Sequence, residues 1–133
     1  METRVFPASD AALYDALAFA EEELEKMDCS MKDMAKITVC VEEMFVNIAH
    51  YAYEGKEGNV EMTFDCEGRK MSVTLADEGV AFDPLAKEDP DITLSAEERR
   101  IGGLGIYMVK KSMDEVRYSR KGNKNYFTMI KEI

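Results

Sequence analysis

The sequence is poor in cysteine, histidine and basic side chains. Its three cysteines, Cys29, Cys40 and Cys66, are odd in number and show no C-x-x-C spacing. They therefore predict reduced, buried thiols rather than a disulfide framework or a zinc site. No apolar run reaches the ~18 residues of a membrane span, and the first residues lack the pattern of a secretory signal. We expect a cytoplasmic protein that does not enter the membrane.

Positive charge is scarce, because 17 Lys and Arg residues stand against 27 Asp and Glu residues, a net charge of -10. Such a surface repels nucleic acid and anionic lipid, so a phosphate would have to bind at a local site. The 133 residues, of which 46% are hydrophobic and 33% charged, are typical of one globular domain over residues 1–133.

Several common catalytic motifs are also missing. No G-x-x-x-x-G-K-[ST] occurs, which excludes a P-loop protein. The stretch Gly103–Met108 lacks a third glycine and does not follow a strand pattern, which disfavours a Rossmann site. The single histidine, His50, has no serine in a nucleophile-elbow pattern to complete a catalytic triad.

The first quarter of the chain predicts a strand and a helix. Residues 3–6 form a short strand pattern, and Ser9 is placed to cap a helix over about residues 10–27. Apolar residues at helical spacing predict its inner face, and the acidic run 21–25 predicts a solvated face. The inner face comprises Leu13, Leu17, Ala20, Leu24 and Met27.

A second helix is predicted from Ser30 or Met31 to Tyr53, with nine apolar residues among the thirteen from 37 to 49. At ~100° per residue these cover most of the helix circumference. The main gap is one narrow arc that must face something polar. It holds Lys36, Glu43, Asn47 and His50.

The remaining pattern predicts strands separated by a long loop. Period-two alternation over residues 59–76 indicates an antiparallel hairpin, whereas residues 77–101 are interrupted by prolines and form a loop with a short helix capped by Ser95. A helix follows Gly105 and ends near Ser112, with strands over 115–120 and 126–133. We expect an α/β (α+β) two-layer sandwich, with a mixed, mainly antiparallel sheet covered by helices on one face.

Glu43 and Asn47 are four residues apart, so their side chains lie one above the other on the polar arc. Their oxygens are hard ligands suited to Mg²⁺, which takes one or two protein groups together with phosphate oxygens. The pair is therefore a candidate for one metal ligand and one group that activates a hydroxyl. The alternative is a simple hydrogen bond on the helix surface.

Two glycine-bearing segments are candidates for nucleotide contacts. Asp77 ends a strand and can accept from an exocyclic amine such as that of adenine, while Gly79 lets the backbone approach a ring closely. Gly103-Leu104-Gly105 precedes a helix, so its amides can bind phosphate. The alternative is a plain turn for the first segment and a packing turn for the second. Arg99 and Arg100 are candidates to reach the phosphates.

Taken in order, E-x-x-x-N, D-x-G and G-x-G resemble the ATPase domain shared by gyrase, Hsp90, histidine kinases and MutL. Within that superfamily, VEEMFVNIAHYAY, DEGVAFDP and GGLGIYMV resemble the anti-sigma factor serine kinases. The resemblance implies that Glu43 is the general base, Asn47 the magnesium ligand and Asp77 the adenine contact. It also makes Gly79 the neighbouring loop glycine, Gly103 to Gly105 the phosphate loop, and residues 82–101 the ATP lid.

The resemblance further implies transfer of the ATP γ-phosphate to a serine of a STAS-type antagonist, with a sigma factor as a second partner and a homodimer as the assembly. Three positions depart from the family pattern: Ala81 replaces a second glycine, Tyr51 stands where a histidine is frequent, and the threonine near the last strand that assists adenine binding has no match in GNKNYFT. The competing hypotheses are an ATP-gated binding module without catalysis and an interaction domain without nucleotide.

Overall fold

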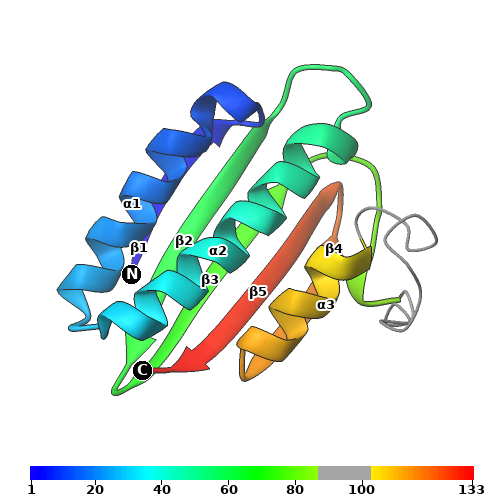
Figure 1. Ribbon diagram of the computed structural model, residues 1–133. Coiled ribbons are helices and arrows are strands. Elements are labelled where there is room, and N and C mark those ends of the chain that lie inside the picture. The colour runs from blue at the N-terminus through cyan, green and yellow to red at the C-terminus, as the bar shows by residue number, and fades with distance from the viewer. Residues whose placement is uncertain (87–102) are drawn as a thin grey trace.

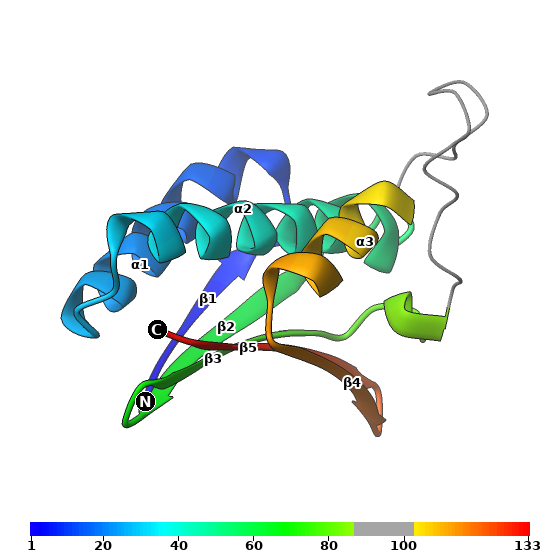
Figure 2. The same ribbon diagram turned by 60° about the horizontal axis from the view of Figure 1, so that its bottom comes forward.

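The protein folds into two layers, one of helices and one of strands. A computed structural model describes residues 1–86 and 103–133. Five strands form one sheet in the order β1-β2-β3-β5-β4, and α1, α2 and α3 all lie on the same face of it (Figure 1). Seen nearly edge-on, α1, α2 and α3 all stand above the sheet (Figure 2). The predicted two-layer sandwich with helices on one face is confirmed.

The N-terminal segment contains β1 (Glu2–Pro7), a 3-10 turn η1 (Asp10–Ala12) and α1 (Leu13–Lys26). The predicted cap by Ser9 is wrong, because the Ser9 side chain makes no cap hydrogen bond and the 3-10 turn comes first. The predicted inner face is confirmed but incomplete: its five residues lie in the core or pack against it, and Ala16 and Phe19 are buried as well. Glu23 is also buried, so the run 21–25 is not wholly a solvated face.

The second helix, α2 (Met31–Asn47), carries the polar arc. Ser30 Oγ accepts a hydrogen bond from the Asp33 amide at 3.1 Å, which caps the helix as its sequence predicts. After Asn47 the helix continues as one wider π-helical turn, η2 (Ile48–Ala52). The predicted extent of this helix is therefore nearly right, but its last turn is π-helical, a geometry often found at functional sites.

All four strand pairings are antiparallel, so the described sheet is antiparallel throughout rather than mixed. Its strands after β1 are β2 (Asn59–Glu67), β3 (Lys70–Asp77), β4 (Glu115–Lys121) and β5 (Lys124–Glu132). A 3-10 turn η3 (Pro84–Ala86) follows β3, and α3 (Gly103–Ser112) precedes β4. Residues 87–102, which include the predicted helix capped by Ser95, lie outside the described residues.

The core lies between the helices and the sheet. Alternate strand residues such as Met62, Val73 and Met129 are fully buried against Phe19 and Phe45 from α1 and α2. This alternation is what a half-covered sheet requires. None of the helices in residues 1–86 and 103–133 has an apolar stretch of the length needed to cross a bilayer.

Candidate functional site

A cavity of about 330 Å³ lies where the C-terminal end of α2 meets the ends of β3 and β5. Its volume is in the range of small-molecule sites. The polar residues that line it include Asn47, Asp77, Tyr118 and Asn125. Its apolar lining comes from Met44, Ile48, Ile106 and Phe127, among others. The cavity is therefore a mainly apolar slot with a few polar groups on its wall.

Asp77 is the most buried carboxylate on this wall, with only 6% of its surface exposed. Its Oδ1 accepts one hydrogen bond from the Gly79 amide at 2.9 Å and another from Asn125 Nδ2 at 3.0 Å. Burying a carboxylate is costly unless it is hydrogen-bonded, and these two donors offset part of that cost.

Gly79 lies flush against the end of the π-helical turn. A Cβ atom added at Gly79 would overlap the carbonyl oxygen, carbonyl carbon and Cβ of Ala52. The same carbonyl oxygen accepts a hydrogen bond from the Val80 amide at 2.8 Å. A glycine is required here because backbone atoms of η2 occupy the space of a side chain, and the contact fixes the segment that follows Asp77.

Glu43 is on α2, one helical turn before Asn47, and its side chain packs against the first turn of α3. A Cβ atom added at Gly105 would overlap the carboxylate of Glu43, so that carboxylate packs directly on the glycine backbone. Gly105 is in the first turn of α3, where amide groups have no partner within the helix. The structure thus brings Glu43 of the E-x-x-x-N pair against the second glycine segment, while Asn47 lines the cavity one helical turn further along α2.

The hairpin of β4 and β5 contributes residues that the sequence pattern did not reveal. Asn125 stands opposite Asp77 in the register of β3 and β5. Arg120 Nη1 donates to the Gly79 carbonyl at 3.0 Å and to Asn125 Oδ1 at 3.1 Å. The available signal was the position of Asn125, a polar residue on the core-facing side of a strand in phase with Phe127 and Met129.

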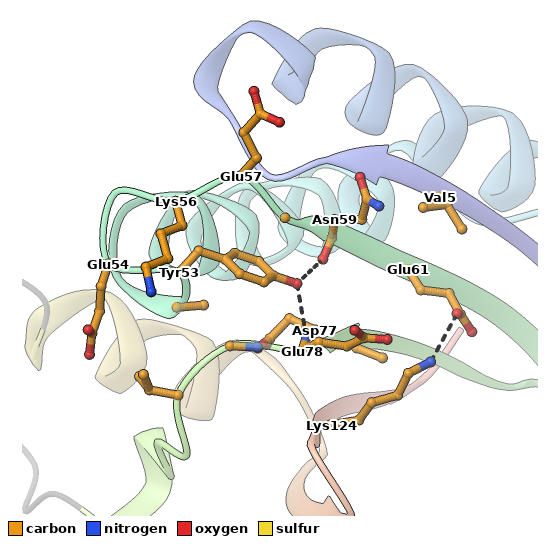
Figure 3. Close-up of a pocket in the computed structure, with 15 residues that line it drawn as sticks. Val5, Tyr53, Glu54, Lys56, Glu57, Asn59, Glu61, Asp77, Glu78 and Lys124 are labelled. Atoms are coloured by element: carbon orange, nitrogen blue, oxygen red, sulfur yellow. Dashed lines mark hydrogen bonds and ion pairs between the residues drawn. The ribbon is translucent and has the colours of Figure 1, made fainter.

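Tyr53 joins three segments near Asp77. It lines a second, larger hollow of about 720 Å³, which Asp77 also lines but Asn47 does not. Its hydroxyl donates to the Asn59 carbonyl at 2.5 Å and accepts from the Glu78 amide at 2.9 Å (Figure 3). The tyrosine therefore ties the end of η2 to the first residue of β2 and to the residue after β3.

Replacing Tyr53 by phenylalanine removes both hydrogen bonds of the hydroxyl. It is expected to lower the free energy of unfolding by about 1–2 kcal/mol, because water replaces the lost bonds to Asn59 and Glu78 only in part. Urea denaturation would measure the change. Tyr14→Phe is the matched control, since Tyr14 is 81% exposed, and it should change the unfolding free energy by less than about 0.5 kcal/mol. Equal changes in unfolding free energy for the two variants would show that the Tyr53 hydroxyl does not stabilise the fold.

Some predicted site residues do not join this cluster. Lys36 is exposed on α2, and His50 Nε2 lies 2.8 Å from an oxygen of Asp10, which links η2 to η1. Gly103 and Leu104 are in the first turn of α3, and only their backbone is described. Arg99, Arg100 and most of the predicted lid lie outside the described residues.

The matched family decides what kind of domain this is. A family model described as the histidine kinase-like ATPase domain matches residues 6–131, nearly the whole chain. The chain belongs to this family. Among solved structures, the Acinetobacter baumannii histidine kinase AdeS covers 99% of this chain and 68% of its own, with a TM-score of 0.51 and 15% identity. At that identity, the likeness shows that the ATPase fold is shared.

Curated relatives of this ATPase domain are named as serine kinases. The serine/threonine-protein kinase BtrW of Bordetella bronchiseptica is 27% identical over 86% of this chain and 82% of its own length. The serine-protein kinase RsbW of Bacillus licheniformis is 31% identical, and the match covers 61% of that protein. RsbW of Bacillus cereus is matched over 59% of its length. The resemblance to the serine kinases of this superfamily is confirmed.

The side chains on the cavity wall fit ATP and Mg²⁺ by their chemistry. Asp77 is a hydrogen-bond acceptor on this wall, and it lies among apolar residues that suit a flat base. The half-buried Asn47 carboxamide on the cavity wall is a hard oxygen donor, as Mg²⁺ prefers. Within residues 1–86 and 103–133, no cluster of three or more His, Cys, Asp and Glu side chains is placed to bind a metal. Asn47 would thus be the protein ligand to a phosphate-bound ion.

A cysteine nucleophile is disfavoured by the surroundings of the thiols. Cys40 is buried within α2, and this burial raises the pKa of its thiol; burial raises the pKa of Cys29 as well. A raised pKa keeps the thiol protonated and unreactive. All three cysteines are free, as predicted, but only Cys40 is buried, whereas Cys29 and Cys66 are half-buried.

Proposed function

We propose that this ATPase domain is a serine protein kinase that transfers the γ-phosphate of ATP to a serine of a STAS-type anti-sigma antagonist. A sigma factor would be its second partner and a homodimer its assembly. The observation that best supports this is the packing of the Glu43 carboxylate on Gly105, one turn before Asn47 on the cavity wall. The serine-kinase relatives add independent support.

Each residue has a distinct role in the proposed reaction. Asp77 accepts a hydrogen bond from the adenine amine, and Gly79 packs on the Ala52 backbone and so fixes the loop beside Asp77. The amides of Gly103, Leu104 and Gly105 bind phosphate at the positive end of α3. Arg100 adds a contact to the phosphates, and residues 82–101 close over them as a lid.

At the reacting end, Asn47 positions the ion, and bound Mg²⁺ would neutralise charge on the phosphate oxygens. Glu43 accepts the proton of the incoming serine hydroxyl, whose oxygen forms a bond to the γ-phosphorus as the bond to the β-phosphate oxygen breaks. ADP and phosphoserine are the products. General-base action of this kind contributes about 10²- to 10⁴-fold to the rate.

A second candidate function is an ATP-gated module that captures a sigma factor or STAS partner without phosphorylating it. Ala81, in place of a second glycine, favours this candidate because it restricts the backbone that follows Asp77. Both candidates require ATP binding, whereas an interaction domain without nucleotide does not.

Two measurements separate the three functions. Saturation with Mg-ATP at about 100 times its dissociation constant is expected to stabilise the fold by about 2.7 kcal/mol, measured by thermal unfolding. Incubation with Mg-ATP and the STAS-type protein is expected to yield phosphoserine, detected by mass spectrometry. Stabilisation without phosphoserine would favour the binding module, and no stabilisation at millimolar ATP would overturn nucleotide binding altogether.

A further inference from the structure

Asn125 is a buried amide with every hydrogen-bonding group engaged. Only 6% of its surface is exposed. Its Nδ2 donates to Asp77 Oδ1 at 3.0 Å and to the Val80 carbonyl at 2.8 Å. Its Oδ1 accepts from the Tyr118 hydroxyl at 2.5 Å and from Arg120 Nη1 at 3.1 Å. The amide has no donor left for a ligand, so it acts through its neighbours.

The orientation of this amide is fixed by chemistry as well as by geometry. An arginine can only donate, and an ionised carboxylate can only accept. If the amide of Asn125 were turned over, its NH₂ group would face Arg120 and its oxygen would face Asp77, so that like groups would oppose each other on both sides. Asn125 therefore always presents a donor to Asp77.

This donor leaves Asp77 with one oxygen for a ligand. Oδ1 already accepts from Asn125 and from the Gly79 amide, which uses both of its lone pairs in the carboxylate plane. Oδ2 has no hydrogen-bond partner among residues 1–86 and 103–133, and Asp77 lines the cavity. Arg120 also donates to the Gly79 carbonyl, which helps to keep the Gly79 amide in place as a donor to Asp77.

A single accepting oxygen suits one purine better than the other. Adenine offers one exocyclic amine, which one oxygen satisfies, whereas guanine places an acceptor at that position. Guanine can pair with a carboxylate through its adjacent N1 and N2 donors, but this fork requires both oxygens. Because Oδ1 of Asp77 is occupied, the fork cannot form.

We propose that Asn125 is a positioning residue that confines Asp77 to one accepting oxygen and thereby makes the cavity select adenine over guanine nucleotides. Tyr118 and Arg120 hold the amide in the orientation that this requires. This inference rests on the proposed function, since it concerns the same nucleotide site.

The test compares the affinities for ATP and GTP, measured by calorimetric titration in the presence of Mg²⁺. Asn125→Leu frees one lone pair of Asp77 Oδ1 at similar side-chain volume, while the Gly79 amide still donates to the other. The ratio of ATP to GTP affinity should fall about tenfold, which is within the discrimination that a bidentate contact to a base provides. Asn123→Leu is the matched control, because Asn123 is exposed in the turn between β4 and β5, and its ratio should equal that of the unmodified protein.

A second variant keeps the test decisive if Asn125→Leu does not fold, as judged by thermal unfolding. Arg120→Met changes an exposed residue and removes a donor to both Asn125 and Gly79, so it should lower the ratio about threefold, less than loss of the amide itself. If the folded variants lose ATP affinity and GTP affinity equally, Asn125 has only a structural role. That result would overturn this inference and leave the proposed function standing. Absence of binding to either nucleotide by the unmodified protein would overturn the proposed function with it.

Discussion

Replacing Glu43 by glutamine is expected to lower the rate of phosphoryl transfer about 10²- to 10⁴-fold, because an amide cannot take the proton of the serine hydroxyl. ATP affinity should stay within about twofold, since glutamine keeps the volume that packs on Gly105 and none of the nucleotide contacts assigned here comes from the carboxylate charge. Phosphoserine formation on the STAS-type protein at saturating Mg-ATP gives the rate, and calorimetric titration gives the affinity.

The neighbouring residue supplies the control. Glu42→Gln makes the same chemical change on the same helix, but Glu42 is exposed, whereas Glu43 is half-buried. Its transfer rate should match that of the unmodified protein. If Glu43→Gln retains full transfer, another group is the base; if it loses ATP affinity as well, the carboxylate acts in binding rather than in proton transfer.

The parts of the fold that were predictable are those with a strong hydrophobic period. The alternation from Val60 to Leu75 predicts the hairpin of β2 and β3, and it is confirmed by their pairing. The boundaries of α1 were less accurate, because Ser9 is followed by a 3-10 turn whose hydrogen bonds compete with a side-chain cap. Glu23 was assigned to solvent because a sequence cannot show that a neighbour, here Lys26 at 2.9 Å, pairs with a buried carboxylate.

The candidate site was predictable where one segment carries the signal. The pairing of Glu43 with Asn47 on one face follows from helical spacing alone. Glu43 packs on Gly105 and Asn47 lines the cavity, while a single pocket and the roles of both residues stay predictions. Asn125 was missed because its importance depends on the pairing of β3 with β5, strands separated by about a third of the chain. Strand register of that range is set by packing and not by local pattern.

Ala81 bears on the choice between the kinase and the binding module, because both functions would use the same ATP pocket. Ala81 lines the cavity two residues after Gly79, on the segment that leads toward η3. An alanine there narrows the backbone angles that a glycine would permit. If this restriction slows phosphoryl transfer, we expect tight ATP binding together with slow formation of phosphoserine.

Replacing Gly79 by alanine is expected to be the most disruptive single methyl addition at this site. The new Cβ would overlap the Ala52 carbonyl, and backbone atoms cannot turn aside as a side chain can. Either η2 or the segment after Asp77 must shift, which breaks the hydrogen bond from the Val80 amide to Ala52. We expect a loss of about 2–4 kcal/mol in unfolding free energy and at least a tenfold loss in ATP affinity.

Gly68→Ala separates this steric cost from the general cost of replacing a glycine. Gly68 has a φ of +64°, and nothing lies within 4 Å of an added Cβ, so its alanine variant should lose only about 1–2 kcal/mol through backbone strain. Gly68 joins β2 to β3 away from the cavity, so that variant should bind ATP normally. Normal ATP affinity in Gly79→Ala would show that the contact with Ala52 does not position Asp77, and the geometry proposed for the adenine end would then be wrong.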